Sequence, residues 1–100
     1  MKAQIELVAT STLAAEDSRM YELSYFIMTY SGAESVMTYG IRAEMRIIGD
    51  KKLYEIEETS PISRDRQFVL EFVQKLANGC VTPLCLHDVV DEFFDEISVA

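Results

Sequence analysis

Apolar and polar residues alternate with a period of two along most of the first 60 residues, which is the pattern of half-buried strands. The alternation is clearest over 37–47, where apolar odd positions alternate with largely polar even positions. Segments 20–31 and 51–59 are also strand-like, and 20–31 is apolar on both sides. A first strand at 3–10 has an apolar side and a mostly polar side, with Ala3, Ile5, Leu7 and Ala9 opposite Gln4, Glu6, Val8 and Thr10. We therefore predict antiparallel strands over about 2–60.

The pairing of the last two strands follows from their turn. Gly49-Asp50 supplies residues that a tight hairpin requires. A loop of two or four residues would place Tyr54 and Ile56 on the apolar face of strand 37–47, because opposite residues of an antiparallel pair share a face. The charged residues would then meet on the other face: Arg42, Arg46, Glu55 and Glu57. We interpret them as cross-strand support on a solvated surface.

After residue 60 the apolar period changes to about 3.6, which indicates helices. Apolar positions within 68–76 form one stripe, Ser63 is a candidate N-cap, and Gly79 is placed to end the helix. A second helix is expected to begin at Thr82-Pro83, because proline is favoured at the first helical position.

These elements predict an α+β fold. We expect an antiparallel β-meander of about four strands, followed by helices at about 64–78 and 83–97. The two helices would form a C-terminal helical hairpin packed on one sheet face. One hundred residues are enough for one hydrophobic core, so we predict a single domain over 1–100.

The charge balance narrows the classes of partner. Seventeen acidic and nine basic residues give a net charge of −8, which argues against binding to nucleic acid or to anionic membranes. A charged partner would be basic. No apolar run approaches the roughly 20 residues that span a bilayer. The N-terminal segment lacks the apolar stretch of a signal peptide, so we expect a cytoplasmic protein.

The stretch from Cys80 to Ile97 holds both cysteines and the only histidine. On a helix, Cys85 and His87 would point roughly 200° apart and could not face one metal ion. We therefore predict no metal site, no cofactor and no catalytic residues, and expect a non-enzymatic protein. A small-ligand, redox or metal sensor that uses Cys85, His87 and Asp88 is the alternative.

The predicted strands leave apolar side chains on the sheet face that the helices do not cover. They form a candidate interface: Val8, Phe26, Met28, Tyr30 and Val36. Face-to-face packing of two sheets would bury such a patch. We therefore predict a small regulatory or protein-interaction domain that forms a homodimer.

The last predicted helix carries acidic side chains and no Lys or Arg. Four of them form a candidate docking ridge: Asp88, Asp91, Glu92 and Asp95. Two interpretations stay open. The ridge is either a solvated face that keeps a small protein soluble or a docking surface for a basic protein partner.

Several caps and core positions together form a recognisable pattern: Tyr39-Gly40-Ile41, Ile62-Ser63, the turn 78–83, and the helix segment 88–93. In this pattern the C-terminal 60 or so residues resemble a family of short bacterial proteins, found mainly in Gram-positive anaerobes and classed as a domain of unknown function. Members of that family place a histidine two residues after the proline of the turn, whereas this chain has Cys85 there and its histidine at His87. The resemblance implies no activity, substrate or catalytic residue.

Overall fold

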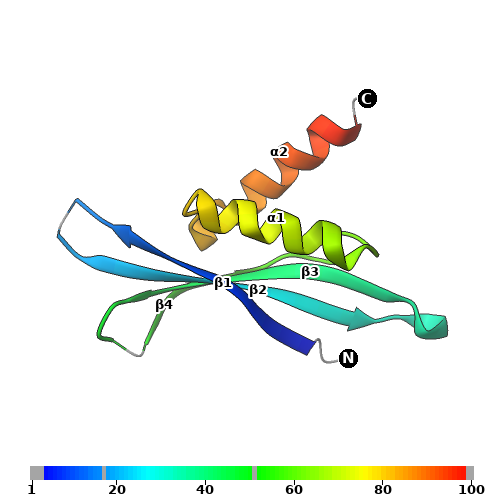
Figure 1. Cartoon of the computed structure of the whole chain (residues 1–100), viewed down its shortest axis with the longest axis horizontal. Helices are drawn as coiled ribbons and strands as arrows, with labels where there is room; N and C mark the ends of the chain where they lie inside the picture. Colours follow the sequence, from blue (N-terminus) through cyan, green and yellow to red (C-terminus); the bar gives the residue numbers. More distant parts are fainter. Residues whose placement is uncertain (1–3, 17, 51, 99–100) are drawn as a thin grey trace.

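The protein is described by a computed structural model that covers residues 4–16, 18–50 and 52–98. Within these residues, four strands form one antiparallel sheet in sequence order: β1 (Gln4–Ala14), β2 (Met20–Ser31), β3 (Met37–Ile47) and β4 (Leu53–Glu58). Two α-helices follow, α1 (Arg66–Asn78) and α2 (Leu86–Ser98), and short 3₁₀ turns lie at η1 (Ala33–Ser35) and η2 (Pro83–Cys85). This arrangement, drawn in Figure 1, confirms the predicted α+β meander followed by helices.

The N-cap of α1 is Asp65, so the prediction of Ser63 is wrong by two residues. The Asp65 carboxylate accepts hydrogen bonds from the backbone N–H groups of Gln67 and Phe68. Ser63 instead forms an isolated bridge with Tyr39, where its carbonyl accepts the Tyr39 N–H at 2.8 Å. A residue that is held against the sheet in this way cannot also begin the helix.

The core lies between the sheet and α1, which rests on β1, β2 and β3 (Figure 1). Its largest fully buried side chains include Tyr25, Leu23 and Ile41. The Tyr25 hydroxyl donates a hydrogen bond of 2.8 Å to the carbonyl of Val81, which fixes the segment after α1 above the sheet. Burial, with a smaller contribution from the charge of Cys80, raises the pKa of Tyr25 well above its ordinary value.

Helix α2 begins on the core and then leads away from the sheet (Figure 1). Leu86 and Val90, in its first half, belong to the core. Further along, Phe93 packs edge-on against Phe72 of α1, with ring centroids 4.5 Å apart, and Lys75 lies over the same ring. Helix α2 is therefore joined to α1 mainly through one aromatic cluster.

The predicted register between β3 and β4 is correct only beside the turn. Arg46 pairs with Leu53, which has the predicted parity, but a β-bulge then inserts Tyr54 and Met45 pairs with Glu55. The inserted residue shifts the remaining pairs by one. It places Ile56 opposite Glu44 on the face away from α1.

The prediction that Glu55 and Glu57 share a face with Arg42 and Arg46 is therefore wrong. Ala43 pairs with Glu57, so both acidic residues lie on the same face as the core positions of β3. A bulge leaves no clear trace in the alternation of a six-residue strand, which is why the sequence pattern alone points to the other pairing.

A second bulge divides β1 in the same way. Leu7 pairs with Phe26, and the next pair in register is Ala9 with Tyr25. Ile5 and Leu7 consequently lie on the face away from α1, whereas Ala9 lies under it. The predicted common apolar side of the first strand is therefore wrong, because it assumed an uninterrupted strand.

Candidate functional site

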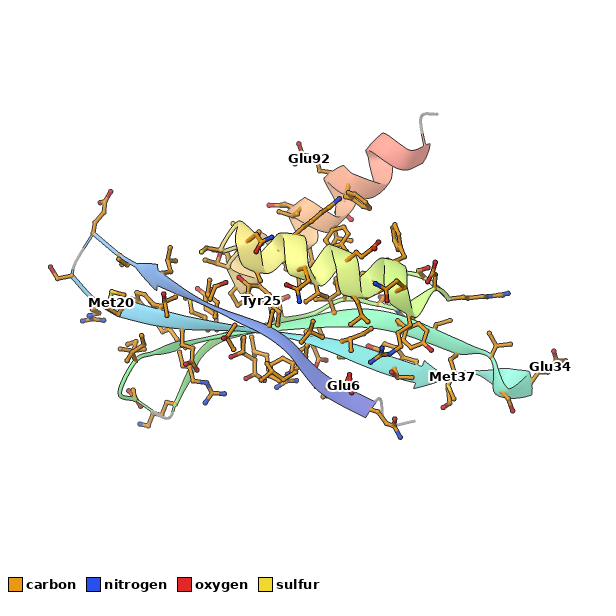
Figure 2. The ribbon with its side chains drawn as sticks, viewed as in Figure 1. Glu6, Met20, Tyr25, Glu34, Met37 and Glu92 are labelled. Carbon is orange, nitrogen blue, oxygen red and sulfur yellow. The ribbon has the colours of Figure 1, made fainter. Side chains whose placement is uncertain are left out.

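The sheet has one face without a helical cover in the part of the chain that the structure describes. We call this the open face; it carries Phe26 of β2 and Arg42 of β3, and Figure 2 shows its side chains projecting away from α1. Ile5 and Leu7 are 49% and 54% exposed on it. Met20 lies on the same face because of the alternation along β2, and Ile56 lies there because it pairs with Glu44. Both side chains are exposed.

One part of the open face is apolar, and we call it the apolar corner: Ile5, Leu7, Phe26 and Met28. Its four members form two cross-strand pairs, Ile5 with Met28 and Leu7 with Phe26. Met28 is almost fully buried, at 1% exposure, while Phe26 is half-buried. The exposed Ile5 and Leu7 of β1 therefore lie beside the more buried Phe26 and Met28 of β2, and contiguous exposed apolar patches are typical of interaction sites.

Tyr30 of β2 lies next to the apolar corner, on the side toward β3. Its hydroxyl donates to the carbonyl of Thr59 at 3.2 Å, and its ring passes over Gly40, where an added Cβ would lie 3.2 Å from the ring. Burial, followed by the charge of Glu58, raises the pKa of the Tyr30 hydroxyl. Tyr30 therefore serves to connect β2 with the segment after β4.

The centre of the open face is occupied by a charge network, formed by Arg42, Glu44, Arg46 and Glu58. Glu44 is only 7% exposed, and its two carboxylate oxygens accept from Arg42 at 2.7 Å and from Arg46 at 2.8 Å. Arg42 also pairs with Glu58. Burial would lower the pKa of Arg42, but its bonds to Glu44 and Glu58 outweigh that effect and raise it.

The structure brings three of the five predicted interface residues together. Phe26, Met28 and Tyr30 lie on the open face. Val8 sits at the β1 bulge and packs against the core on the other side of the sheet. Val36 lies beyond η1, where its carbonyl accepts the N–H of Gly32.

The predicted interface omits four exposed members of this face, Met20, Ile5, Leu7 and Ile56. The alternation places Ile5, Leu7 and Ile56 on the buried side, and each of these three changes face because of a bulge. The only local signal is the hydrophobicity of the residues themselves. It does not say which face they occupy.

On α2, the candidate docking ridge is exposed as far as its side chains are described. Asp88, Asp91 and Glu92 all lie in solvent, whereas the side chain of Asp95 lies outside the described residues. Asp91 also lines a surface hollow at the base of α2, which is described below, whereas Asp88 does not.

The candidate sensor residues do not converge on a common site. Cys85 is exposed in η2, and the Sγ of the other cysteine, Cys80, lies 3.7 Å from the carbonyl of Thr12. His87 pairs with Glu57 of β4, with 3.0 Å between Nε2 and the carboxylate oxygen. Among the described side chains, no group of three or more Cys, His, Asp or Glu residues is arranged to hold a metal ion.

A hollow of about 300 Å³ lies where α2 meets the connection that follows β4. Its lining combines apolar and polar side chains from two distant parts of the chain: Thr59, Ser60, Pro61, Ile62, His87, Val90 and Asp91. Its volume lies at the lower end of the range for small-ligand sites, and its lining is nearly as polar as it is apolar.

The fold and its surfaces define a small α+β domain with one sheet face covered by helices and the other uncovered. The chain belongs to the family of unknown function DUF6514, whose model matches residues 4–96. This match confirms the predicted membership of a domain family of unknown function and extends it across both the sheet and the helices. Searches of curated proteins and of solved structures found no match. Among the described helices, none is long and apolar enough to cross a membrane.

Proposed function

We propose that this chain is a small protein-interaction domain and that its open face binds a second copy of itself. The observation that carries the proposal is the exposure of Ile5 and Leu7 beside Phe26, on a face that no described helix covers. About 25 cal/mol is gained for each Å² of apolar surface removed from water, so covering this corner is favourable.

The charge of the open face favours a second copy as the occupant. Its strand residues include three acidic side chains, Glu22, Glu44 and Glu58, and two basic ones, Arg42 and Arg46, which gives 2 − 3 = −1. The whole chain carries −8. Two copies that approach through their open faces therefore meet across a surface of low net charge, while most of the acidic groups stay in solvent.

The size of the face is also adequate. With strands about 4.8 Å apart and a rise of about 3.3 Å per residue, four strands over about nine residues span about 600 Å². Two copies would bury about 1,200 Å² in total, the lower end of the range for specific interfaces. A two-fold axis through the apolar corner would place the corner of one copy on that of the other.

The test is the mass in solution, measured by light scattering over a range of concentrations. The wild-type chain should give twice the monomer mass of 11.4 kDa, and Leu7→Glu should give the monomer. Leu84→Glu is the matched control, because Leu84 is 76% exposed but lies in η2. A monomeric wild type, or equal dissociation of the two variants, would refute the proposed face.

A further inference from the structure

The hollow at the base of α2 has no part in the proposed self-association. It is built from the connection that leaves β4 and from the first turns of α2, while the open face is built from strands alone. At about 300 Å³ it is large enough for a ligand of a few non-hydrogen atoms.

Its walls have apolar and polar parts, and the polar part includes Thr59 and Ser60 of the connection as well as two residues of α2. Pro61, Ile62 and Val90 supply apolar surface. On the polar side, His87 and Asp91 are four residues apart on α2 and so lie on one side of the helix. A ligand that fits both parts has a short aliphatic chain and one polar end.

The charges determine which polar end is favoured. Asp91 makes no hydrogen bond or ion pair with the described residues, so its carboxylate is open to a ligand. A second carboxylate, that of Glu57, lies against His87 at 3.0 Å and holds the ring at the rim. The chain as a whole is strongly acidic, which concentrates cations around it and repels anions.

We infer that this hollow is a binding site for a small primary alkylamine. The ammonium group pairs with the Asp91 carboxylate, and the aliphatic chain lies on Pro61, Ile62 and Val90. The ammonium donates hydrogen bonds to an ionised acceptor, which is the stronger class of hydrogen bond. His87 borders the bound chain and therefore reports its arrival.

The experiment uses the fact that His87 is the only histidine in the chain, so its ring protons give one assignable set of NMR signals. The protein is titrated with n-butylamine, n-butanol and butyrate at one pH and ionic strength. We expect a saturable shift with butylamine alone. No saturable shift, or the same shift with butanol, would overturn the site.

Two variants separate a site from general attraction. Asp91→Asn should weaken butylamine binding by about tenfold, the loss expected for one charge-assisted hydrogen bond. Asp88→Asn removes the same charge from an exposed position on the same helix, outside the hollow, and should leave binding close to wild type. Equal effects would show that only the acidic surface attracts the amine, which would overturn the proposal.

A final arm distinguishes the source of the amine. Lysine with blocked backbone ends carries the same ammonium on a similar chain, so it tests a protein side chain as the occupant. Butylamine should bind at least as tightly as blocked lysine. Much tighter binding of the lysine would refute a small molecule as the ligand.

Discussion

Gly40 offers the sharpest test of how β3 packs against the segment that follows β4. Gly40 is buried in the sheet, opposite Met28. A Cβ added at this position would lie 3.1 Å from the Ser60 carbonyl oxygen and 3.1 Å from the Thr59 Oγ1. The Tyr30 ring would be 3.2 Å away. These distances are tighter than ordinary contact, so Gly40→Ala requires the neighbours to move.

The neighbours are poorly placed to move. Thr59 Oγ1 accepts the Ile41 N–H at 2.9 Å, and the Tyr30 hydroxyl donates to the Thr59 carbonyl at 3.2 Å. Overpacking of this kind costs about 1–3 kcal/mol. Alanine also restricts the unfolded chain, which offsets about 0.4–1 kcal/mol. We therefore expect Gly40→Ala to lose about 1 kcal/mol, or about 4–8 °C in melting temperature for a domain of this size.

The measurement is thermal unfolding followed by circular dichroism, with all samples at one protein concentration because self-association would shift the midpoint. Gly79→Ala is the control. Gly79 has a φ of −90°, and the nearest atom to its added Cβ is the Lys75 carbonyl oxygen at 3.5 Å, so alanine fits without strain. Its melting temperature should equal or exceed that of the wild type. A Gly40→Ala variant as stable as Gly79→Ala would refute the packing argument.

Three further changes test other contacts by the same unfolding assay. Tyr25→Phe leaves the Val81 carbonyl without its donor and should cost about 1–2 kcal/mol. Because the folded-state pKa of Tyr25 is raised, the stability from its hydroxyl is present below about pH 10 and lost as the pH rises further, so the variant should show a weaker alkaline decline. Phe93→Ala removes the ring that packs on Phe72, so it should lower the helical signal in far-ultraviolet circular dichroism and cost about 1–3 kcal/mol of stability. An unchanged helical signal would contradict the proposed anchor of α2. Glu44→Ala removes the shared partner of two arginines and should cost about 1–3 kcal/mol, and a neutral result would show that the charge network adds no stability.

The fold class could be predicted from the sequence because it depends on periods that extend over many residues. Eleven residues of clean alternation identify β3, and the change of period after residue 60 identifies the helices. The sequence does not determine the N-cap of α1, because Ser63 and Asp65 are both good capping residues, and only the tertiary bridge between Ser63 and Tyr39 decides between them.

The surfaces could be predicted only in part. The alternation in β2 predicts the uncovered face for Phe26 and Tyr30, and they lie there because β2 is regular along its length. The hollow beside His87 could not be foreseen, because Asp91 and Ile62 come together only when α2 docks on the connection after β4. The hydrophobic periodicity of single helices and strands carries no information about tertiary contacts between distant segments.

The two bulges supply a physical argument for the proposed self-association through the open face. Without the bulge in β1, Ile5 and Leu7 would share the face of Ala9 under α1; with it they lie in solvent, and Glu6 lies on the helical side, where Arg66 pairs with it at 2.6 Å. The bulge in β4 does the same: Ile56 moves to the open face, and Glu57 moves to the helical side, where it meets His87.

Each bulge therefore exchanges apolar burial for an ion pair or hydrogen bond at the surface. Half-exposure of Ile5 and Leu7 forgoes about 1 kcal/mol for each side chain, while an exposed pair such as Glu6 with Arg66 returns at most about 1 kcal/mol. Counted over Ile5, Leu7 and the Glu6–Arg66 pair alone, the exchange is unfavourable for an isolated copy, although the same bulge places Val8 against the core. In the proposed self-association, a second copy that covers Ile5, Leu7 and Phe26 would recover this burial between the two copies.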